Sequence, residues 1–144
     1  DQLDAARAAA IVAALGAVDV GKGAVVARGL CLGVEALPGT DALLDFVAAH
    51  RGLVPMPKAG VFFKAPKPGQ DRRIDLPALG PQTVARVAAA GLSGIVFEAG
   101  GVLLLDRAAT IAAAEAAGIF LWGRSPGSFF SSPAKPRATS WARH

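Results

Sequence analysis

The sequence predicts a single α/β domain in which helices flank a mixed β-sheet. Short apolar runs of strand length alternate with longer segments of helical periodicity along most of the chain. Some of the apolar runs follow one another closely enough to form hairpins, so the sheet is expected to contain antiparallel pairs as well as parallel ones. With 144 residues, of which 53% are hydrophobic and 6% aromatic, the chain is long enough to bury one core.

Four helices are expected, because apolar residues recur at helical spacing between recognisable end signals. Gly16 ends the first helix, and Thr40 is a favourable N-cap for the second. Pro81 suits the first position of the third helix, while Asp106 caps the fourth and Gly118 stops it. In chain order the predicted helices cover residues 3–16, 41–50, 81–90 and 107–117.

Six strands are expected from short apolar runs bounded by Gly, Pro and polar residues. The turn at residues 28–29 joins the first two strands into a hairpin, and residues 98–101 join the fourth strand to the fifth in the same way. In chain order the predicted strands cover residues 24–27, 30–35, 60–64, 93–97, 102–105 and 119–122.

The positive charge of the chain is concentrated at its end. The formal charge is +4, but residues 124–144 contain four of the 15 basic groups and no acid, so 11 basic and 11 acidic groups remain before them. A neutral body argues against a nucleic-acid partner. We expect a folded domain at residues 1–123 and a disordered basic tail, rich in Ser and Pro, at 124–144.

Several classes of site and location are disfavoured. No apolar run approaches the roughly 20 residues that span a bilayer, and no signal peptide opens the chain, so a cytosolic, soluble or peripheral protein is expected. Cys31 is the only cysteine and is expected to be a small buried hydrophobe, while His50 is expected on the surface at a helix end. Phosphate-binding GxxxxGK[ST], dinucleotide-binding GxGxxG and nucleophile-elbow GxSxG motifs are absent from the sequence.

The loop at residues 64–81 carries the strongest indication of chemistry. Its prolines and Gly69 exclude a regular helix, so it is expected to display side chains in a defined loop. Asp71, Asp75 and Gln70 can direct oxygens to one point, as Mg²⁺ or Mn²⁺ prefers. Three further carboxylates, those of Asp19, Glu35 and Glu98, lie at other strand ends or in loops.

Basic side chains in the same loop suit a phosphate or pyrophosphate, which arginine binds in bidentate fashion and lysine as a point charge. These residues are Lys64, Lys67, Arg72 and Arg73. A metal ion beside such a phosphate would orient water and stabilise the developing charge. The loop charges can equally form salt bridges on the surface of an ordered loop, and their spacing leaves both interpretations open.

Several motifs, in this order and spacing, resemble the UDP-2,3-diacylglucosamine pyrophosphatases of the LpxI type. They are DVG at 19–21, LGVEA at 32–36, GTD at 39–41, KPGQD at 67–71, DLP at 75–77, GPQT at 80–83, EAG at 98–100 and AGI at 117–119. The resemblance covers residues 5–122 and corresponds to the C-terminal domain of a two-domain family. Lys22 stands where the family pattern has Gln.

The resemblance implies an enzyme that hydrolyses UDP-2,3-diacylglucosamine to UMP and 2,3-diacylglucosamine 1-phosphate. This Mg²⁺-dependent step of lipid A biosynthesis takes place at the cytoplasmic face of a Gram-negative inner membrane, where the protein is expected to be peripheral. Because the N-terminal domain of the family is missing here, activity of this chain alone is expected to be impaired. The alternative is a non-catalytic module that binds a sugar nucleotide or a phospholipid headgroup.

The resemblance also implies roles for individual residues. Asp71 is the expected essential acid, supported by Asp75 and Gln70, with Asp71, Asp75 and Glu35 as metal ligands. Substrate binding is assigned to Lys64, Lys67, Arg73, Asp19, Thr40, Asp41 and Glu98. Phe62, Phe63, Leu53 and Val54 are candidates for an acyl groove, although core packing is the preferred interpretation of the two phenylalanines.

Overall fold

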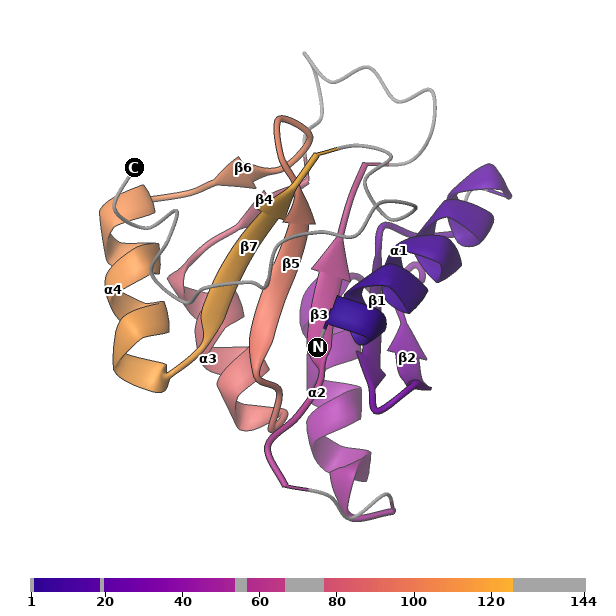
Figure 1. Cartoon of the computed structure of the whole chain (residues 1–144), viewed down its shortest axis with the longest axis horizontal. Coiled ribbons are helices and arrows are strands. Elements are labelled where there is room, and N and C mark those ends of the chain that lie inside the picture. The colour runs from indigo at the N-terminus through magenta and orange to yellow at the C-terminus, as the bar shows by residue number, and fades with distance from the viewer. Residues whose placement is uncertain (1, 19, 54–56, 67–76, 126–144) are drawn as a thin grey trace.

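The computed structural model describes residues 2–18, 20–53, 57–66 and 77–125, whose arrangement is shown in Figure 1. Its main sheet has the strand order β2-β1-β3-β5-β7. The strands are β1 (Gly23–Ala27), β2 (Leu30–Val34), β3 (Val61–Lys64), β5 (Gly94–Glu98) and β7 (Phe120–Arg124). The β1–β2 and β1–β3 pairs are antiparallel, whereas β3–β5 and β5–β7 are parallel. The predicted mixed sheet of an α/β domain is confirmed.

Helices cover both faces of this sheet (Figure 1). They are α1 (Gln2–Ala17), α2 (Thr40–His50), α3 (Pro81–Ala89) and α4 (Arg107–Ala117), with a 3₁₀ turn η1 (Arg51–Leu53) after α2. Helix α1 packs on β1 and β3 from one side. The other three helices contribute to the larger core on the opposite side. Since β3 and β5 lie between these layers, their apolar runs are buried on both faces.

The two phenylalanines of β3 belong to the two different cores. Phe62 is fully buried in the core under α2, α3 and α4, and Phe63 is buried in the core under α1. Their opposite directions follow from the alternation of side chains along a strand. The core interpretation of Phe62 and Phe63 is therefore confirmed.

The predicted hairpin between β5 and the following strand is wrong. β6 (Leu103–Leu104) instead pairs in parallel with β4 (Ala78–Leu79), and the two form a separate small sheet. The reason is that β5 has only two edges, which β3 and β7 occupy. β4 lies inside the segment that was expected to be a loop, and its two residues are too few to produce a period-two signal.

Two predicted helix caps also differ in detail. Gly39, with a φ of 96°, occupies the N-cap position of α2, and the Thr40 hydroxyl bonds elsewhere. Asp106 does occupy the N-cap position of α4, with a φ of 45°, but its side chain makes no capping hydrogen bond. Gly118 ends α4 in the left-handed conformation, as predicted.

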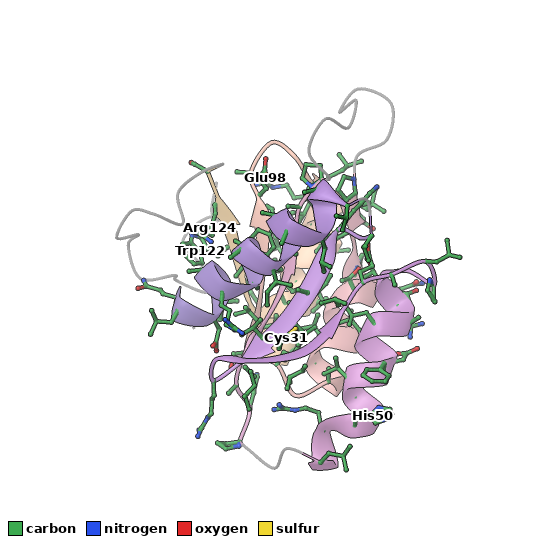
Figure 2. All side chains as sticks on the ribbon, turned by 90° about the vertical axis from the view of Figure 1, so that its right-hand side faces the viewer. Cys31, His50, Glu98, Trp122 and Arg124 are labelled. Atoms are coloured by element: carbon green, nitrogen blue, oxygen red, sulfur yellow. The ribbon has the colours of Figure 1, made fainter. Side chains whose placement is uncertain are left out.

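Cys31 is exposed, which contradicts the expectation of a buried thiol. It lies on β2, which is an edge strand of the sheet and is covered less completely than its neighbours. Figure 2 labels Cys31 together with His50, which is exposed at the end of α2 as predicted. The His50 Nδ1 atom lies 2.7 Å from the Phe46 carbonyl oxygen.

The last strand extends further than predicted. β7 includes Gly123 and Arg124, and the Arg124 side chain is buried although the residue was expected to begin the tail. The rest of the predicted tail, residues 126–144, lies outside the described part of the chain. Within the described part, no helix combines the length and apolar character that crossing a membrane requires.

Asp4 fastens α1 to the turn between β1 and β2. Its two carboxylate oxygens accept hydrogen bonds from the backbone N–H groups of Arg28, at 3.0 Å, and Gly29, at 2.8 Å. Asp4 belongs to α1 and is buried, so both bonds connect the helix to the β1–β2 turn away from solvent. The carboxylate therefore replaces water as the partner of two turn amides.

We expect Asp4→Ala to lower the free energy of unfolding by about 2 kcal/mol, because two amides lose a charged acceptor. Urea unfolding of the variant and the wild type provides the measurement. Glu115→Ala, which removes an exposed carboxylate from α4, is the matched control and is expected to change stability by less than about 0.5 kcal/mol. Equal effects of the two substitutions would contradict this role of Asp4.

Candidate functional site

Lys64 lies at the carboxyl end of β3 and points toward the face covered by α2, α3 and α4. The direction follows from side-chain alternation, since Phe62 faces the core on that side and Phe63 faces α1. Only 8% of the residue is exposed. A buried ammonium group must be hydrogen-bonded, so its partners define the surroundings of the site.

A chain of hydrogen bonds connects Lys64 to Glu35. The Lys64 Nζ atom donates to the Thr40 Oγ1 atom at 2.7 Å and to the Ala78 carbonyl oxygen at 3.3 Å. The Thr40 hydroxyl donates in turn to Glu35 Oε2. Glu35 Oε1 accepts the backbone N–H of Lys22 at 3.1 Å. The ends of β2 and β3, the start of α2 and β4 are thereby joined at one place.

Gly21 is required for this arrangement. A Cβ atom at this position would lie 2.0 Å from the Glu35 carbonyl oxygen and 2.7 Å from its carbonyl carbon. Both of these are backbone atoms that cannot turn away. The absence of a side chain therefore lets the segment before β1 pass directly against Glu35, which gives a physical reason for the glycine of the DVG motif.

Burial lowers the pKa of Lys64 below its ordinary value, because desolvation disfavours the ammonium form. The charge of Glu35 raises the pKa, Lys22 lowers it and Asp41 raises it, and burial is the largest of these effects. The site therefore holds a cation at a cost, and an anionic ligand placed beside it would offset that cost.

Asp41 influences Lys64 by its charge but faces outward. Its side chain is 61% exposed, and its Oδ1 atom lies 3.4 Å from the Arg86 Nε atom. Arg86 also bonds Asp45 at 2.7 Å. Among the described contacts, Asp41 thus joins α2 to α3 on the surface rather than lining the buried chain of hydrogen bonds.

Glu98 lies at the end of β5, on the opposite face of the sheet from Lys64. The registers pair Lys64 with Phe97, and Glu98 with Arg124. Because side chains alternate, Glu98 and Arg124 share the α1 side. Figure 2 shows Arg124 next to Trp122, and the Arg124 guanidinium lies 5.3 Å from the centre of the Trp122 ring. Arg124 also donates to the Ala5 carbonyl oxygen of α1 at 3.4 Å.

The remaining predicted site residues lie outside the described part of the chain. They are Asp19, Lys67, Gln70, Asp71, Arg73 and Asp75, and Val54 of the predicted acyl groove is outside it as well. The described residues on either side of 67–76 lie near Lys64. Ala65 directly follows Lys64, and the Ala78 carbonyl oxygen accepts a hydrogen bond from the Lys64 Nζ atom at 3.3 Å.

Sequence reasoning missed three contributors to the site. The Ala78 carbonyl oxygen and the Lys22 amide act through the backbone, so no side-chain pattern indicates them. The role of Gly21 is steric, and the DVG motif was its only signal in the sequence. Thr40 was predicted to bind substrate, and the structure places its hydroxyl between Lys64 and Glu35.

The described residues do not by themselves form a metal site. No group of three or more His, Cys, Asp or Glu side chains lies among them in a suitable arrangement. Glu35 is the one predicted metal ligand that is described, and both of its carboxylate oxygens accept hydrogen bonds. A site that uses Asp71 or Asp75 would involve residues outside the described ranges.

Comparison with known proteins decides the family. The profile of the LpxI C-terminal domain matches residues 1–122, which is most of the chain. The chain belongs to the LpxI family. One relative in this family, described as UDP-2,3-diacylglucosamine pyrophosphatase LpxI from Caulobacter vibrioides, is 49% identical over 127 residues. That match covers 85% of this chain and 45% of the relative, so the chain spans about half the length of this LpxI protein.

We expect Thr40→Val to destabilise the protein by about 2 kcal/mol, because Lys64 loses an acceptor and Glu35 loses a donor in a buried site. Valine keeps the shape of threonine, which separates the loss of the hydroxyl from a loss of volume. Thr40→Ser keeps the hydroxyl and is expected to retain most of the stability. Chemical denaturation measures both variants, and equal losses for Val and Ser would contradict a role for the hydroxyl.

The stability of the protein is also expected to depend on pH through Lys64. The relevant pH window lies between the lowered pKa of Lys64 in the folded state and the ordinary lysine pKa of 10.5. Within it the unfolded chain binds more protons than the folded one, so the free energy of unfolding rises with pH. We therefore expect the wild type to gain stability relative to Lys64→Met as the pH increases through this window. Denaturant unfolding at a series of pH values measures the difference, and a difference that is flat with pH would refute the expectation.

Proposed function

We propose that this chain is part of an enzyme that hydrolyses the pyrophosphate of UDP-2,3-diacylglucosamine to UMP and 2,3-diacylglucosamine 1-phosphate. The observation that carries the proposal is the 49% identity to a relative named for pyrophosphatase action on this compound. In this proposal the protein is cytoplasmic, acts peripherally at the inner membrane of a Gram-negative bacterium and serves lipid A biosynthesis.

The chain corresponds to less than half of that relative, so we propose that it needs the remaining part for full activity. The match covers 45% of the relative's length. A substrate with a nucleotide at one end and two acyl chains at the other has several groups to position, and misplacement of the reacting groups by 1 Å can cost about 100-fold in rate. The 144 residues by themselves are therefore expected to turn over the substrate more slowly than a protein that also contains the rest of the relative's length.

The proposed reaction is a direct attack of water on one phosphorus of the pyrophosphate. A new bond forms between the water oxygen and that phosphorus, while the bond from the phosphorus to the bridging oxygen breaks. Asp71 is assigned to orient the water and accept its proton, with Asp75 and Gln70 in support. Lys64, Lys67 and Arg73 would offset the charge on the phosphate oxygens, which is the largest contribution in many phosphoryl transfers.

The geometry around Lys64 supports this assignment for one of the cations. Lys64 is held by Thr40 and by the Ala78 carbonyl oxygen at the carboxyl end of β3. In α/β sheets, ligands bind beyond the carboxyl ends of the parallel strands. An ammonium group positioned before the substrate arrives is effective, because it needs no reorganisation during the reaction.

Magnesium remains part of the proposal, with manganese as the alternative ion. Mg²⁺ is usually bound by one or two carboxylates together with substrate phosphates, and Asp71 and Asp75 are the residues assigned to it, with Glu35 as a third candidate. Such an ion, when bound, neutralises phosphate charge and polarises water. The described residues do not hold a complete ligand set for the ion.

An apolar cavity next to the Lys64 site suits the acylated end of the substrate. A cavity of about 330 Å³ lies between β2 and α2, and its lining includes Gly39, Pro38, Leu43 and Phe46. Gly39 directly precedes Thr40, so the cavity borders the chain of hydrogen bonds at Lys64. A second cavity, of about 240 Å³, continues past Phe46 to Leu53, which was predicted to contact acyl chains.

In a protein that contains this domain and the rest of the relative's length, we expect Asp71→Ala to lower the rate of UMP release by at least about 100-fold. Lys64→Met is expected to lower it as well, because one fixed cation is lost. Glu115→Ala, which changes an exposed carboxylate on α4, is the matched control. An Asp71→Ala protein that hydrolyses the substrate at the normal rate would refute the assignment.

The same assay separates hydrolysis from binding alone. The alternative is a non-catalytic module for a sugar nucleotide or a phospholipid headgroup, and it is favoured by the match to only part of the relative. If both the chain alone and the longer protein bind UDP-2,3-diacylglucosamine but neither releases UMP, the alternative is supported and the proposed hydrolysis is excluded.

A further inference from the structure

Glu35 is a buried carboxylate whose two oxygens are both engaged within the protein. Only 7% of the residue is exposed. Its Oε1 atom accepts the backbone N–H of Lys22 at 3.1 Å, and its Oε2 atom accepts the Thr40 hydroxyl. Its own backbone N–H donates to the Gly23 carbonyl oxygen at 2.8 Å, so main chain and side chain are both tied to the start of β1. The carboxylate is therefore fixed in place before any ligand arrives.

The donors and acceptors at this place allow only one direction for the chain of hydrogen bonds. A lysine ammonium group has three donors and no acceptor, whereas a hydroxyl has a single hydrogen to donate. Lys64 must therefore donate to the Thr40 Oγ1 atom, at 2.7 Å, and the hydroxyl hydrogen must point to Glu35. Glu35 thereby determines how the Thr40 hydroxyl is rotated, and the lone pairs of that hydroxyl are turned toward Lys64.

The Thr40 hydroxyl determines in turn how the Lys64 ammonium group is oriented. Two of the three N–H bonds of this group go to the Thr40 Oγ1 atom and, at 3.3 Å, to the Ala78 carbonyl oxygen. When two bonds of a tetrahedral group are fixed, the direction of the third is fixed as well. Among the described contacts the third hydrogen has no protein acceptor, so it is available to an anionic oxygen at the carboxyl end of β3.

The same contacts disfavour Glu35 as a metal ligand. A cation bound at Oε2 would have to displace the hydrogen of Thr40, and only one hydroxyl would separate it from the ammonium group of Lys64, which repels it. A cation at Oε1 would compete with the Lys22 amide. A buried carboxylate with these neighbours is suited to holding a donor in one orientation.

We propose that Glu35 is a positioning residue for the hydrolysis, which acts on Lys64 through the Thr40 hydroxyl and binds no metal. This role rests on the proposed function, in which the Lys64 ammonium group offsets charge on a phosphate oxygen. Glu35 touches neither the substrate nor the attacking water. It keeps the third hydrogen of the ammonium group directed at the phosphate, and a donor that is oriented in advance needs no reorganisation during the reaction.

Steady-state hydrolysis tests this role in a protein that contains this domain and the rest of the relative's length. Glu35→Gln keeps the size of the side chain but offers one oxygen to two donors. It is expected to lower kcat about tenfold with little change in KM, because the lost contact acts on charge in the transition state. Thr40→Val breaks the chain at its next member and is expected to lower kcat by a similar factor. In a Lys64→Met protein, Glu35→Gln is expected to have no further effect, because the positioned group is absent.

Three results in this assay would overturn the positioning role. One is a tenfold increase in the Mg²⁺ concentration that Glu35→Gln needs for half-maximal rate, which indicates a metal ligand. Another is a further loss of rate when Glu35→Gln is added to Lys64→Met. The last is an unchanged kcat per folded Glu35→Gln molecule, which limits the carboxylate to stability. Glu115→Gln removes an exposed carboxylate from α4 as the matched control and is expected to leave kcat unchanged.

A second measurement uses the 144-residue chain and does not depend on hydrolysis. The hydrogens of the Lys64 ammonium group are followed by heteronuclear NMR at mildly acidic pH, where hydrogen bonds slow their exchange with water. Glu35→Gln and Thr40→Val are expected to speed this exchange about tenfold, whereas Glu115→Gln is expected to leave it unchanged. Unchanged exchange in folded Glu35→Gln overturns the inference. Faster exchange in that variant, with no hydrolysis by the longer protein, supports the contact and refutes the proposed function instead.

Discussion

The ammonium group of Lys64 is buried, and an ion in the protein interior is stable only where hydrogen bonds and opposite charge replace water. This requirement determines how four elements meet. β3 supplies the lysine, α2 supplies Thr40, β4 supplies the carbonyl oxygen of Ala78, and Glu35 follows β2. The same contacts that satisfy the lysine hold the end of β3 in place, so the candidate site is part of the framework of the domain.

The alternation of side chains along the strands divides the charged residues between two environments. Lys64 faces the larger core, and so do Phe97 and Gly123, which lie in register with it on β5 and β7. Glu98 and Arg124 instead face α1. Consecutive residues at a strand end, such as Phe97 and Glu98, therefore face different layers of the domain. One apolar cavity lies between β2 and α2, and another cavity, bordered by Arg107, lies at the carboxyl ends of β5 and β7.

The sequence indicated three of the residues that meet at the candidate site, but not the contacts between them. Glu35 and Thr40 lie in the LGVEA and GTD motifs, Lys64 belongs to the charged loop at 64–81, and the structure brings the three together. Their functions in the fold depend on partners that a motif does not specify, such as the Lys22 amide and the Ala78 carbonyl oxygen. Asp71 and its neighbours stay predictions from the family resemblance, since they lie outside the described residues.

Sequence periodicity by itself determined the four helices, the strands of the main sheet and the α/β class, because these depend on local propensity and on apolar spacing. Only the tertiary structure decided which strands pair. β6 joins β4 because both edges of β5 are occupied, and Cys31 is exposed because β2 lies at the edge of the sheet. Strand order and burial depend on contacts between distant parts of the chain, and no short stretch of sequence contains that information.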